Sequence, residues 1–404
     1  MKRLVPISLL ALLVAVPAYS VQEEFRGIWV ECEGSNSTLS SKQRIAAMLD
    51  TVANANFNAV IVQVYRGNRC WFDSSIGDTV PFDEVKKKDR IDPLQFTIDE
   101  GHKRGLQVHA WVNVFRIARN INAPMLKKLG PEIVMMDNKG RSFLDYNNFS
   151  LPKDEAKHIT LSDETIMLDP ANDKVQEYQL AVVKEIMTKY QKLDGIHLDF
   201  IRYPYTVPYS PGSRFAKTLQ FGYTKAALKK FKEQTGLDPN SMVLNTKNTQ
   251  AWDDFRREQM TRFVRSAYEL CEKTSPRISV SAAALCWADR AYMAAFQDWR
   301  GWLEDGIVDF VVSMNYTKDR RLARYLSRTV IHASDTRCGY VGLQAYMHPV
   351  VPAEVVDQIV DCRKAGGRGI VIFSYDSLLK EQPGFFDILR KGLFSEKAGI
   401  PELR

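Results

Sequence analysis

The sequence lacks the short motifs that mark several common enzyme classes. No Gly-x-Gly-x-x-Gly or Gly-x-x-x-x-Gly-Lys segment follows a predicted strand, which argues against a nicotinamide or phosphate site. No Gly-x-Ser-x-Gly elbow occurs, which argues against a serine hydrolase. The six cysteines form no Cys-x-x-Cys pair, so the usual spacing of zinc ligands is missing. The sequence therefore predicts neither a cofactor nor a bound metal.

Dense charge of one sign and long apolar runs are also missing. The net charge is +7, and no block of lysine and arginine is dense enough to predict binding to nucleic acid. After the N-terminal segment, no run approaches the ~18 apolar residues that a transmembrane helix needs. The sequence therefore predicts no nucleic-acid partner and no transmembrane segment, and it leaves the oligomeric state open.

The first twenty residues are typical of a secretory signal peptide. Lys2 and Arg3 precede an apolar run over residues 4–16, and Ala18-Tyr19-Ser20 places small residues at the two positions that a signal peptidase reads. We expect cleavage after Ser20 and export to the periplasm or the extracellular space. Removal of the two basic residues lowers the net charge from +7 to +5.

The rest of the chain alternates short β-branched runs with longer helical patterns, which is typical of βα units around a parallel sheet. Pro93 and Gly105 mark the start and the end of one such helix. Eight such runs joined by helix-length crossovers favour an α/β fold, a closed (β/α)8 TIM barrel, over a doubly wound open sheet. The predicted strands cover residues 25–32, 59–65, 106–115, 195–200, 278–286, 308–315, 339–346 and 369–375.

Two long segments interrupt this alternation. Residues 116–165 and 203–250 follow the third and fourth predicted strands. They are expected to be extended loops that wall a cleft at the C-terminal face of the barrel. No Pro/Gly/Ser-rich linker or change in composition occurs, so residues 21–404 are interpreted as a single glycosidase-like domain.

In a closed barrel, the residues that end the strands meet at one mouth. Aromatic rings there would stack on the apolar faces of sugars, while amides and arginines would bind the hydroxyl groups. This composition predicts a glycan or polysaccharide substrate. The candidate substrate-binding residues are Tyr65, Trp111, Asn113, Arg202, Tyr203, Trp287, Asn315, Tyr316, Gln344 and Tyr375.

Asp199 is the leading candidate for catalysis. It stands at the exit of the apolar run 195–200, with Arg202 three residues later. A carboxylate at the C-terminal end of a barrel strand is typical of catalytic residues in this architecture. A structural alternative stays open, in which Asp199 pairs with Arg202 or Arg116 and orders the mouth.

Glycoside hydrolysis requires a second carboxyl group, roughly 5–5.5 Å from the first for retention or 6.5–9.5 Å for inversion. Glu31 ends the first predicted strand and Asp376 follows the eighth, and both are candidates. Asp289 and Asp319 lie in loops near the fifth and sixth strands, closer to Asp199 around the ring. The sequence does not choose among them.

Motifs spread over residues 24–380 resemble the glycosyl-hydrolase-like-10 family, formerly a domain of unknown function. The matching segments, in family order, lie at 26–30, 167–172, 194–199, 202–204, 298–299, 308–310 and 314–316. The resemblance implies an exported or lipid-anchored bacterial barrel related to glycosidases, some of whose members cleave peptidoglycan glycan strands that lack stem peptides. It matches the family's strand-four aspartate to Asp199 and its strand-eight acidic position to Asp376. Many relatives carry a second aspartate where this chain has Phe200.

These observations predict an exported glycoside hydrolase that cleaves O-glycosidic bonds of a polysaccharide or cell-wall glycan, with Asp199 as nucleophile or charge stabiliser. The alternative is a glycan-binding barrel that has lost hydrolytic activity. A metal-dependent deacetylase is a third option. It would use His109 and His197, but both lie in the middle of predicted strands, where buried core histidines are more common.

Overall fold

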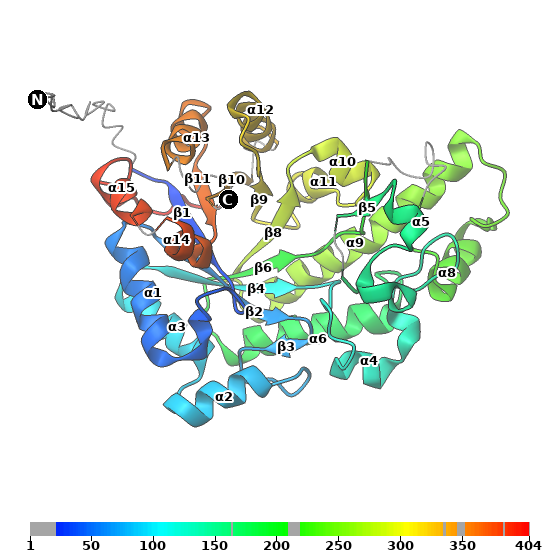
Figure 1. Cartoon of the computed structure of the whole chain (residues 1–404), viewed down its shortest axis with the longest axis horizontal. Helices are drawn as coiled ribbons and strands as arrows, with labels where there is room; N and C mark the ends of the chain where they lie inside the picture. The colour runs from blue at the N-terminus through cyan, green and yellow to red at the C-terminus, as the bar shows by residue number, and fades with distance from the viewer. Residues whose placement is uncertain are drawn as a thin grey trace, which may run out of the picture.

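Eight parallel strands close into a barrel in the computed structural model, which describes residues 22–162, 165–208, 219–333, 337–345, 352–382 and 384–403. Around the ring the strands follow the order β1, β2, β4, β6, β8, β9, β10, β11, and β1 pairs with both β2 and β11 (Figure 1). The predicted (β/α)8 architecture is therefore confirmed. The strands are β1 (Phe25–Val30), β2 (Ala59–Arg66), β4 (Gln107–Asn113), β6 (Gly195–Asp199), β8 (Ser279–Leu285), β9 (Phe310–Met314), β10 (Cys338–Gln344) and β11 (Gly369–Phe373).

Each observed strand agrees with its predicted run to within two residues at either end. Tyr346, at the end of the seventh predicted run, lies outside the described residues. A short strand, β3 (Arg69–Cys70), adds an antiparallel extension to β2. The signal-peptide prediction for residues 1–20 also falls outside the described part of the chain.

Helices connect successive strands and surround the barrel (Figure 1). Two of these helices begin with a side chain that caps their first backbone N–H groups. Asp92 accepts hydrogen bonds from the first backbone N–H groups of α3, which starts at Pro93, and Asn172 does the same for α6. Each barrel strand is followed by at least one helix, and these helices include α1 (Lys42–Asn54), α3 (Pro93–Lys103), α6 (Asp173–Lys189), α9 (Thr246–Thr274), α11 (Trp299–Glu304), α12 (Arg320–Ile331), α13 (Pro352–Lys364) and α15 (Phe385–Lys391).

The barrel interior is filled by large side chains from alternate strand positions. Phe25, Phe310 and Tyr340 pack together at the N-terminal end, with ring centroids 4.8–5.4 Å apart. Trp29 and Trp111 belong to the same interior cluster, nearer the C-terminal mouth. Side chains along a strand alternate between faces, so residues two positions further along the same strands also face inward at the mouth.

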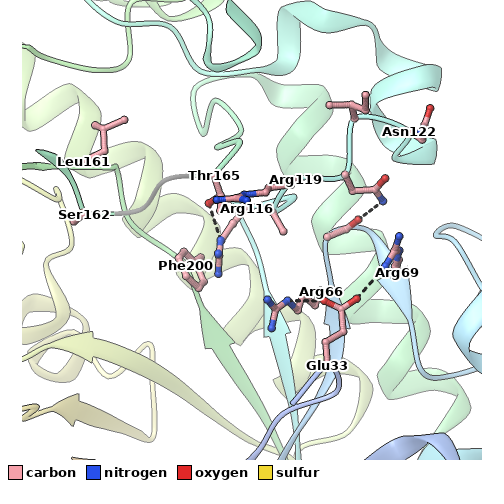
Figure 2. Close-up of a pocket in the computed structure, with 14 residues that line it drawn as sticks. Glu33, Arg66, Arg69, Arg116, Arg119, Asn122, Leu161, Ser162, Thr165 and Phe200 are labelled. Atoms are coloured by element: carbon pink, nitrogen blue, oxygen red, sulfur yellow. Dashed lines mark hydrogen bonds and ion pairs between the residues drawn. The ribbon is translucent and has the colours of Figure 1, made fainter. Parts of the chain in front are cut away.

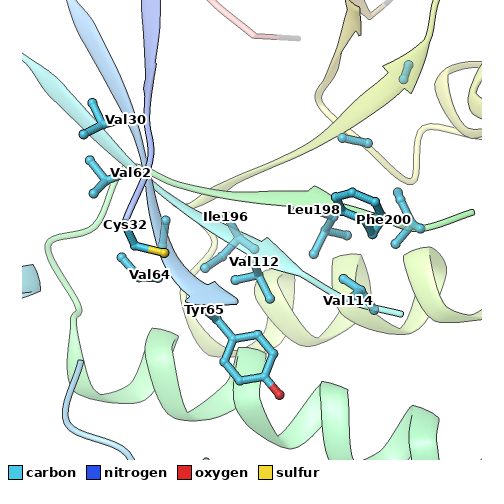
Figure 3. Close-up of a cluster of buried hydrophobic side chains, with 14 of the residues drawn as sticks. Val30, Cys32, Val62, Val64, Tyr65, Val112, Val114, Ile196, Leu198 and Phe200 are labelled. Carbon is cyan, nitrogen blue, oxygen red and sulfur yellow. The ribbon is translucent and has the colours of Figure 1, made fainter. Parts of the chain in front are cut away.

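The opposite faces of the strands pack against the helices. Figure 3 shows outward-facing residues of four neighbouring strands, including Val30, Val62, Val112 and Leu198, in one apolar layer. All four are fully buried. This layer carries most of the apolar burial and leaves the interior positions at the mouth available for polar residues.

The two barrel histidines are buried core residues, as expected from their mid-strand positions. His197 Nε2 accepts a hydrogen bond from Trp29 Nε1 at 3.2 Å, and its Nδ1 is hydrogen-bonded to Ser281 Oγ at 2.9 Å. Burial lowers the pKa of His197 to about 3 and that of His109 to about 4. Both rings are therefore neutral near pH 7, and among the described residues no group of three or more His, Cys, Asp or Glu side chains is arranged to hold a metal.

The long segments after β4 and β6 form the predicted extended loops. Residues 116–165 contain two short helices, α4 (Pro124–Leu129) and α5 (Lys153–Ala156), and β5 (Thr160–Leu161), which pairs with β7 (Thr206–Val207). The second loop contains α8 (Lys225–Thr235), which packs on α9 through a small cluster around Trp252. The remaining short helices are α2 (Val80–Asp89), α10 (Ala288–Met293) and α14 (Tyr375–Glu381).

None of the helices in the described ranges is long and apolar enough to cross a bilayer. The six cysteines are all unpaired thiols, and five of them are buried. Of the three that lie in or beside the barrel strands, Cys32 and Cys338 are buried and Cys286 is half-buried.

The packed interior of the barrel leaves no room for a side chain at Gly195. A Cβ atom at this position would lie 2.0 Å from His109 Nδ1 and 2.7 Å from Ser279 Oγ. His109 cannot move aside, because its ring contacts the rings of Phe25 and Phe310. We expect Gly195→Ala to lower the free energy of unfolding by about 1–3 kcal/mol, the usual cost of overpacking.

Urea denaturation followed by circular dichroism measures this change. Gly384→Ala is the matched control, because a Cβ atom there would meet nothing within 4 Å. Equal stability of the two variants would contradict the packing argument.

Candidate functional site

Asp199 lies at the C-terminal mouth of the barrel, with 5% of its surface exposed. Three N–H groups donate hydrogen bonds to its carboxylate. Trp111 Nε1 lies 3.1 Å from Oδ2, while Arg202 Nη1 at 3.2 Å and the backbone nitrogen of Phe200 at 2.6 Å reach Oδ1. A carboxylate only accepts hydrogen bonds, so these donors fix its orientation. Two predicted site residues, Trp111 and Arg202, therefore contact Asp199 directly.

Four neighbouring strands each bring one polar residue to the inside of the mouth. Asn113 is the register partner of Asp199, and its Oδ1 accepts a hydrogen bond from Gln63 Nε2 at 3.3 Å. Glu31 follows β1 directly, beside Gln63 in the adjoining β2. Glu31, Gln63, Asn113 and Asp199 thus form a polar arc across β1, β2, β4 and β6, with the two carboxyl groups at its ends.

Aromatic rings line the interior of the barrel next to this arc. Phe373 lies 5.9 Å from Trp29, 6.4 Å from Trp111 and 5.8 Å from Tyr316, measured between ring centroids. Tyr316 and Phe373 are half-buried, whereas both tryptophans are buried. This aromatic floor, defined by Trp29, Trp111, Tyr316 and Phe373, includes two of the residues predicted to contact sugars.

Glu31 occupies a half-buried position between β1 and β11. Its Oε2 accepts a hydrogen bond from Ser374 Oγ at 2.8 Å. Burial raises the pKa of Glu31, and the nearby negative charge of Asp376 raises it further, while the Ser374 hydrogen bond and Arg66 act in the opposite direction. A carboxyl group with a raised pKa is a better proton donor near neutral pH than an ordinary glutamate.

Asp376 holds the loop that follows β1. Its Oδ1 accepts hydrogen bonds from the backbone nitrogen of Asn36 and from Thr38 Oγ1, both at 3.2 Å, and its Oδ2 accepts one from the backbone nitrogen of Glu31 at 3.3 Å. Only 1% of its surface is exposed. Burial raises the pKa of Asp376, and the three donors lower it. These contacts give the predicted catalytic residue Asp376 a structural task, namely to position Glu31.

A cleft of about 800 Å³ opens beside the polar arc (Figure 2). Phe200, the neighbour of Asp199, forms part of its wall. The extended loop after β4 supplies much of the rest, as predicted for this insertion, whereas no described residue of the 203–250 loop lines the cleft. The lining residues are Glu33, Arg66, Gly67, Arg69, Arg116, Ala118, Arg119, Asn120, Ile121, Asn122, Leu161, Ser162, Thr165 and Phe200.

Phe200 has a strained backbone and two cationic neighbours. Its φ angle is 52°, in the left-handed region that a bulky side chain rarely adopts. The guanidinium carbons of Arg202 and Arg116 lie 4.0 and 4.2 Å from the centre of its ring. The ring therefore connects Arg202, which donates to Asp199, with Arg116, which lines the cleft.

The structure corrects the prediction for four tyrosine and asparagine residues, which lie in the core and not at the mouth. A β-bulge between Gln63 and Tyr65 shifts the register of β2, so that Tyr65 pairs with the outward-facing Val112 and points towards the surrounding helices (Figure 3). Asn315 is one position out of phase with the inward residues of β9, and its side chain bonds Ser313 and Ser327. The other two are Tyr203, packed edge-on against Phe296, and Tyr375, packed against Phe386.

The remaining predicted residues lie at the mouth or its rim. Gln344 is buried on β10 in register with Phe373 of the aromatic floor. Trp287 lies half-buried beyond β8, where its ring is 6.3 Å from that of Tyr325 and the Arg290 guanidinium covers it at 4.6 Å. Among the described lining residues of the cleft, neither Gln344 nor Trp287 is found.

Two arginines of the cleft lie away from the ends of the predicted barrel strands. Arg69 lies on β3, a short antiparallel strand with no apolar pattern of its own, and Arg119 lies in the loop after β4. The only sequence signal was the length of that loop together with its arginines. Phe200 was noted as a departure from the family pattern, but its contacts with two guanidinium groups could not be foreseen.

Residues 24–345 match the family described as glycosyl hydrolase-like 10. The chain belongs to this family. It is 25% identical to glycosyl hydrolase YngK of Bacillus subtilis, over 94% of this chain and 74% of YngK. It is also 25% identical to glycosyl hydrolase DigH of Escherichia coli K12, over 80% of this chain and 74% of DigH.

Solved structures of glycosidases have the same fold. The catalytic domain of β-amylase from Paenibacillus polymyxa aligns with a TM-score of 0.57 at 14% identity, over 92% of this chain and 99% of that domain. A GH42 β-galactosidase from G. stearothermophilus aligns with a TM-score of 0.59 at 11% identity, over 95% of this chain and 58% of the galactosidase. At these identities the likeness concerns the barrel alone.

The raised pKa of Glu31 has a consequence for stability. Above that pKa the folded protein holds a charged carboxylate that burial destabilises, whereas the unfolded chain holds the same charge in water. Glu31→Gln removes this cost, so we expect a higher unfolding temperature at about pH 8. The gain should shrink as the pH falls through the raised pKa, and it should vanish near the ordinary glutamate value of about 4.3.

Thermal unfolding at several pH values measures this effect. Glu33→Gln is the matched control, because Glu33 is more exposed and is balanced by Arg66 at 3.1 Å and Arg69 at 3.0 Å. A pH-independent gain for Glu31→Gln, or an equal gain for Glu33→Gln, would contradict the assignment.

Removal of the Asp376 carboxylate should destabilise the loop after β1. Asp376→Ala leaves the donors on Glu31, Asn36 and Thr38 without their acceptor, so we expect a loss of about 1–3 kcal/mol in the free energy of unfolding. Asp376→Asn keeps one oxygen acceptor and should lose less. Urea denaturation of both variants compares them, and unchanged stability of the alanine variant would refute the structural role.

Proposed function

We propose that this protein is an exported glycoside hydrolase that cleaves O-glycosidic bonds of a polysaccharide or cell-wall glycan, with Asp199 as nucleophile or charge stabiliser and Glu31 as the acid. The observation that carries the proposal is the polar arc at the barrel mouth, which ends in these two carboxyl groups. Family membership and the names of the relatives YngK and DigH support the reaction class.

The different surroundings of the two carboxyl groups support different roles. Asp199 receives three hydrogen bonds from N–H donors, one of them from a guanidinium, which suits a group that acts as an anion. Glu31 is held by one hydroxyl group and has a raised pKa. Two carboxyl groups with opposite environments are the usual arrangement in glycosidases, where one protonates the departing oxygen and the other faces the anomeric carbon.

In the proposed reaction, Glu31 donates its proton to the glycosidic oxygen as the bond to the anomeric carbon breaks. Asp199 stabilises the positive charge that develops on the sugar, or bonds to it, and water completes the hydrolysis. The aromatic floor would bind the apolar face of the sugar, and Gln63 and Asn113 would bind hydroxyl groups. No step requires a cofactor.

Export is also part of the proposal. The basic residues, apolar run and small residues within positions 1–20 support cleavage after Ser20 and a location outside the cytoplasm. We propose that residues 21–404 then act as a single glycosidase-like domain.

The alternative function is glycan binding without cleavage. Phe200 favours it, because many relatives carry a second aspartate at this position and this chain has a ring held between two guanidinium groups. Under this alternative, Asp199 would bind a sugar hydroxyl and order the mouth.

Single amide substitutions test the proposal. Release of reducing ends from a panel of purified polysaccharides and peptidoglycan glycan strands is measured for the wild type, Asp199→Asn and Glu31→Gln. We expect loss of a nucleophilic Asp199 to lower kcat by ~10⁴-fold, and loss of the acid by about 10²–10⁴-fold with disappearance of the alkaline limb of the pH profile. Asp387→Asn, which changes an exposed carboxylate on α15, is the matched control and should retain activity.

Three outcomes separate the two functions. Cleavage by the wild type that both amide variants abolish, with glycan binding retained, supports the enzyme. Binding by the wild type without cleavage of any panel member supports the glycan-binding alternative. Cleavage that survives Asp199→Asn refutes the assigned roles.

A further inference from the structure

The described lining residues of the cleft beside the polar arc carry more positive than negative groups. Among its described lining residues, four are arginines and one is a carboxylate, Glu33. The whole chain has a net charge of only +7 over 404 residues, so this concentration is local. A single arginine can bind the hydroxyl groups of a neutral sugar, but a cluster of guanidinium groups favours a ligand with negative charge.

Two of these four arginines pair with the same carboxylate. Glu33 is shared between Arg66 and Arg69, with N–O distances of 3.1 and 3.0 Å (Figure 2). Arg69 also lies 3.8 Å from Asp78, outside the cleft. Arg119 is exposed, and no carboxylate of the described residues lies within 4.0 Å of it. One guanidinium group therefore faces the cleft without a counter-ion in the described part of the chain.

The neighbouring cleft does not share this excess of positively charged lining residues. A second space of about 790 Å³ adjoins the first and shares Glu33 and Arg69 with it. Its remaining charged residues are Asp78, Glu84 and Lys88, so acidic groups outnumber basic ones there. A glycan chain that runs through both spaces would meet the excess of cations only on the Arg119 side.

Two arginines of the cleft, Arg66 and Arg116, lie next to the proposed reactive groups. Arg116 Nε donates to Thr165 Oγ1 at 2.8 Å, and its guanidinium covers Phe200, the residue after Asp199. Arg66 is close enough to influence the pKa of Glu31. A group bound in this cleft would thus be attached to a sugar at or next to the point of cleavage.

We propose that the cleft recognises an oxyanion substituent, such as a carboxylate or a sulfate, on the sugars of the glycan, with Arg119 and Arg69 as specificity-determining residues. This inference rests on the proposed function, because it names the chemical class of the substrate. The planar guanidinium group donates two parallel hydrogen bonds to such an oxyanion, which adds orientation to charge. The protein would therefore select acidic glycans over neutral ones of the same backbone.

Glycan binding by the Asp199→Asn variant, which should not cleave the probes, tests this preference for acidic glycans. The probes are matched pairs on one affinity array: oligogalacturonate with its carboxyl-reduced form, and a sulfated galactan with its desulfated form, beside neutral glucans. We expect at least one acidic probe to bind about 10-fold or more tightly than its neutral counterpart, as one charge-assisted contact allows. Rising salt should weaken that preference. Which pair responds distinguishes a carboxylate from a sulfate ligand.

Arginine substitutions then test whether the preference for acidic probes arises in the cleft. Arg119→Gln and Arg69→Gln, each in the Asp199→Asn background, should lower the preference for the acidic probe about 5-fold or more and leave neutral binding unchanged. Arg321→Gln, which changes an exposed arginine on α12, is the matched control and should have no effect. Retention of no acidic probe, equal affinity within every pair, or a preference that survives both cleft substitutions would overturn the proposal. Faster cleavage of the neutral member of a pair than of its acidic member by the wild type would overturn it as well and leave the hydrolase function intact.

Discussion

The site depends on complementary side-chain sizes inside a closed barrel. Gly195 leaves the space that His109 occupies, and Gly342 leaves the space for the ring of Trp29, since Cβ atoms there would lie 2.0 and 2.9 Å from those rings. Filled in this way, the interior is a packed core up to the level of the aromatic floor. Only the inward-facing residues between the aromatic floor and the solvent can contact a substrate. Because β1 pairs with both β2 and β11, the register of the closed barrel determines which residues these are.

Much of this arrangement follows from strand periodicity. Trp111, Asn113 and Asp199 could be placed at the mouth from the sequence because they continue the inward alternation of strands whose limits the apolar runs define. The same rule failed for Tyr65, because a bulge adds one residue to β2, and no residue type in that run signals it. It failed for Tyr203 and Tyr375 for another reason, since both follow strand ends, where the chain turns and alternation no longer applies.

The cleft was harder to predict than the barrel. Its arginines come from a two-residue strand and from a loop, and neither has a periodic pattern that would fix the direction of a side chain. Loop length indicated that a wall would exist, but not that it would be cationic. The different roles of Asp376 and Glu31 likewise could not be predicted from the sequence. Both residues follow barrel strands, and they differ only in the hydrogen bonds that they accept in the folded protein.

Phe200 contacts Asp199 of the polar arc and also lines the cleft. Its backbone N–H donates to the Asp199 carboxylate, and its unusual φ angle turns the chain directly after Asp199, where its ring lies between Arg116 and Arg202. A guanidinium over an aromatic face gains about 0.5–2 kcal/mol, and it keeps its N–H groups available at its edge. An aspartate at this position would instead form an ion pair with Arg202 and compete with Asp199 for it. The ring thus contacts both guanidinium groups, of which that of Arg202 orients Asp199 and that of Arg116 lines the cleft.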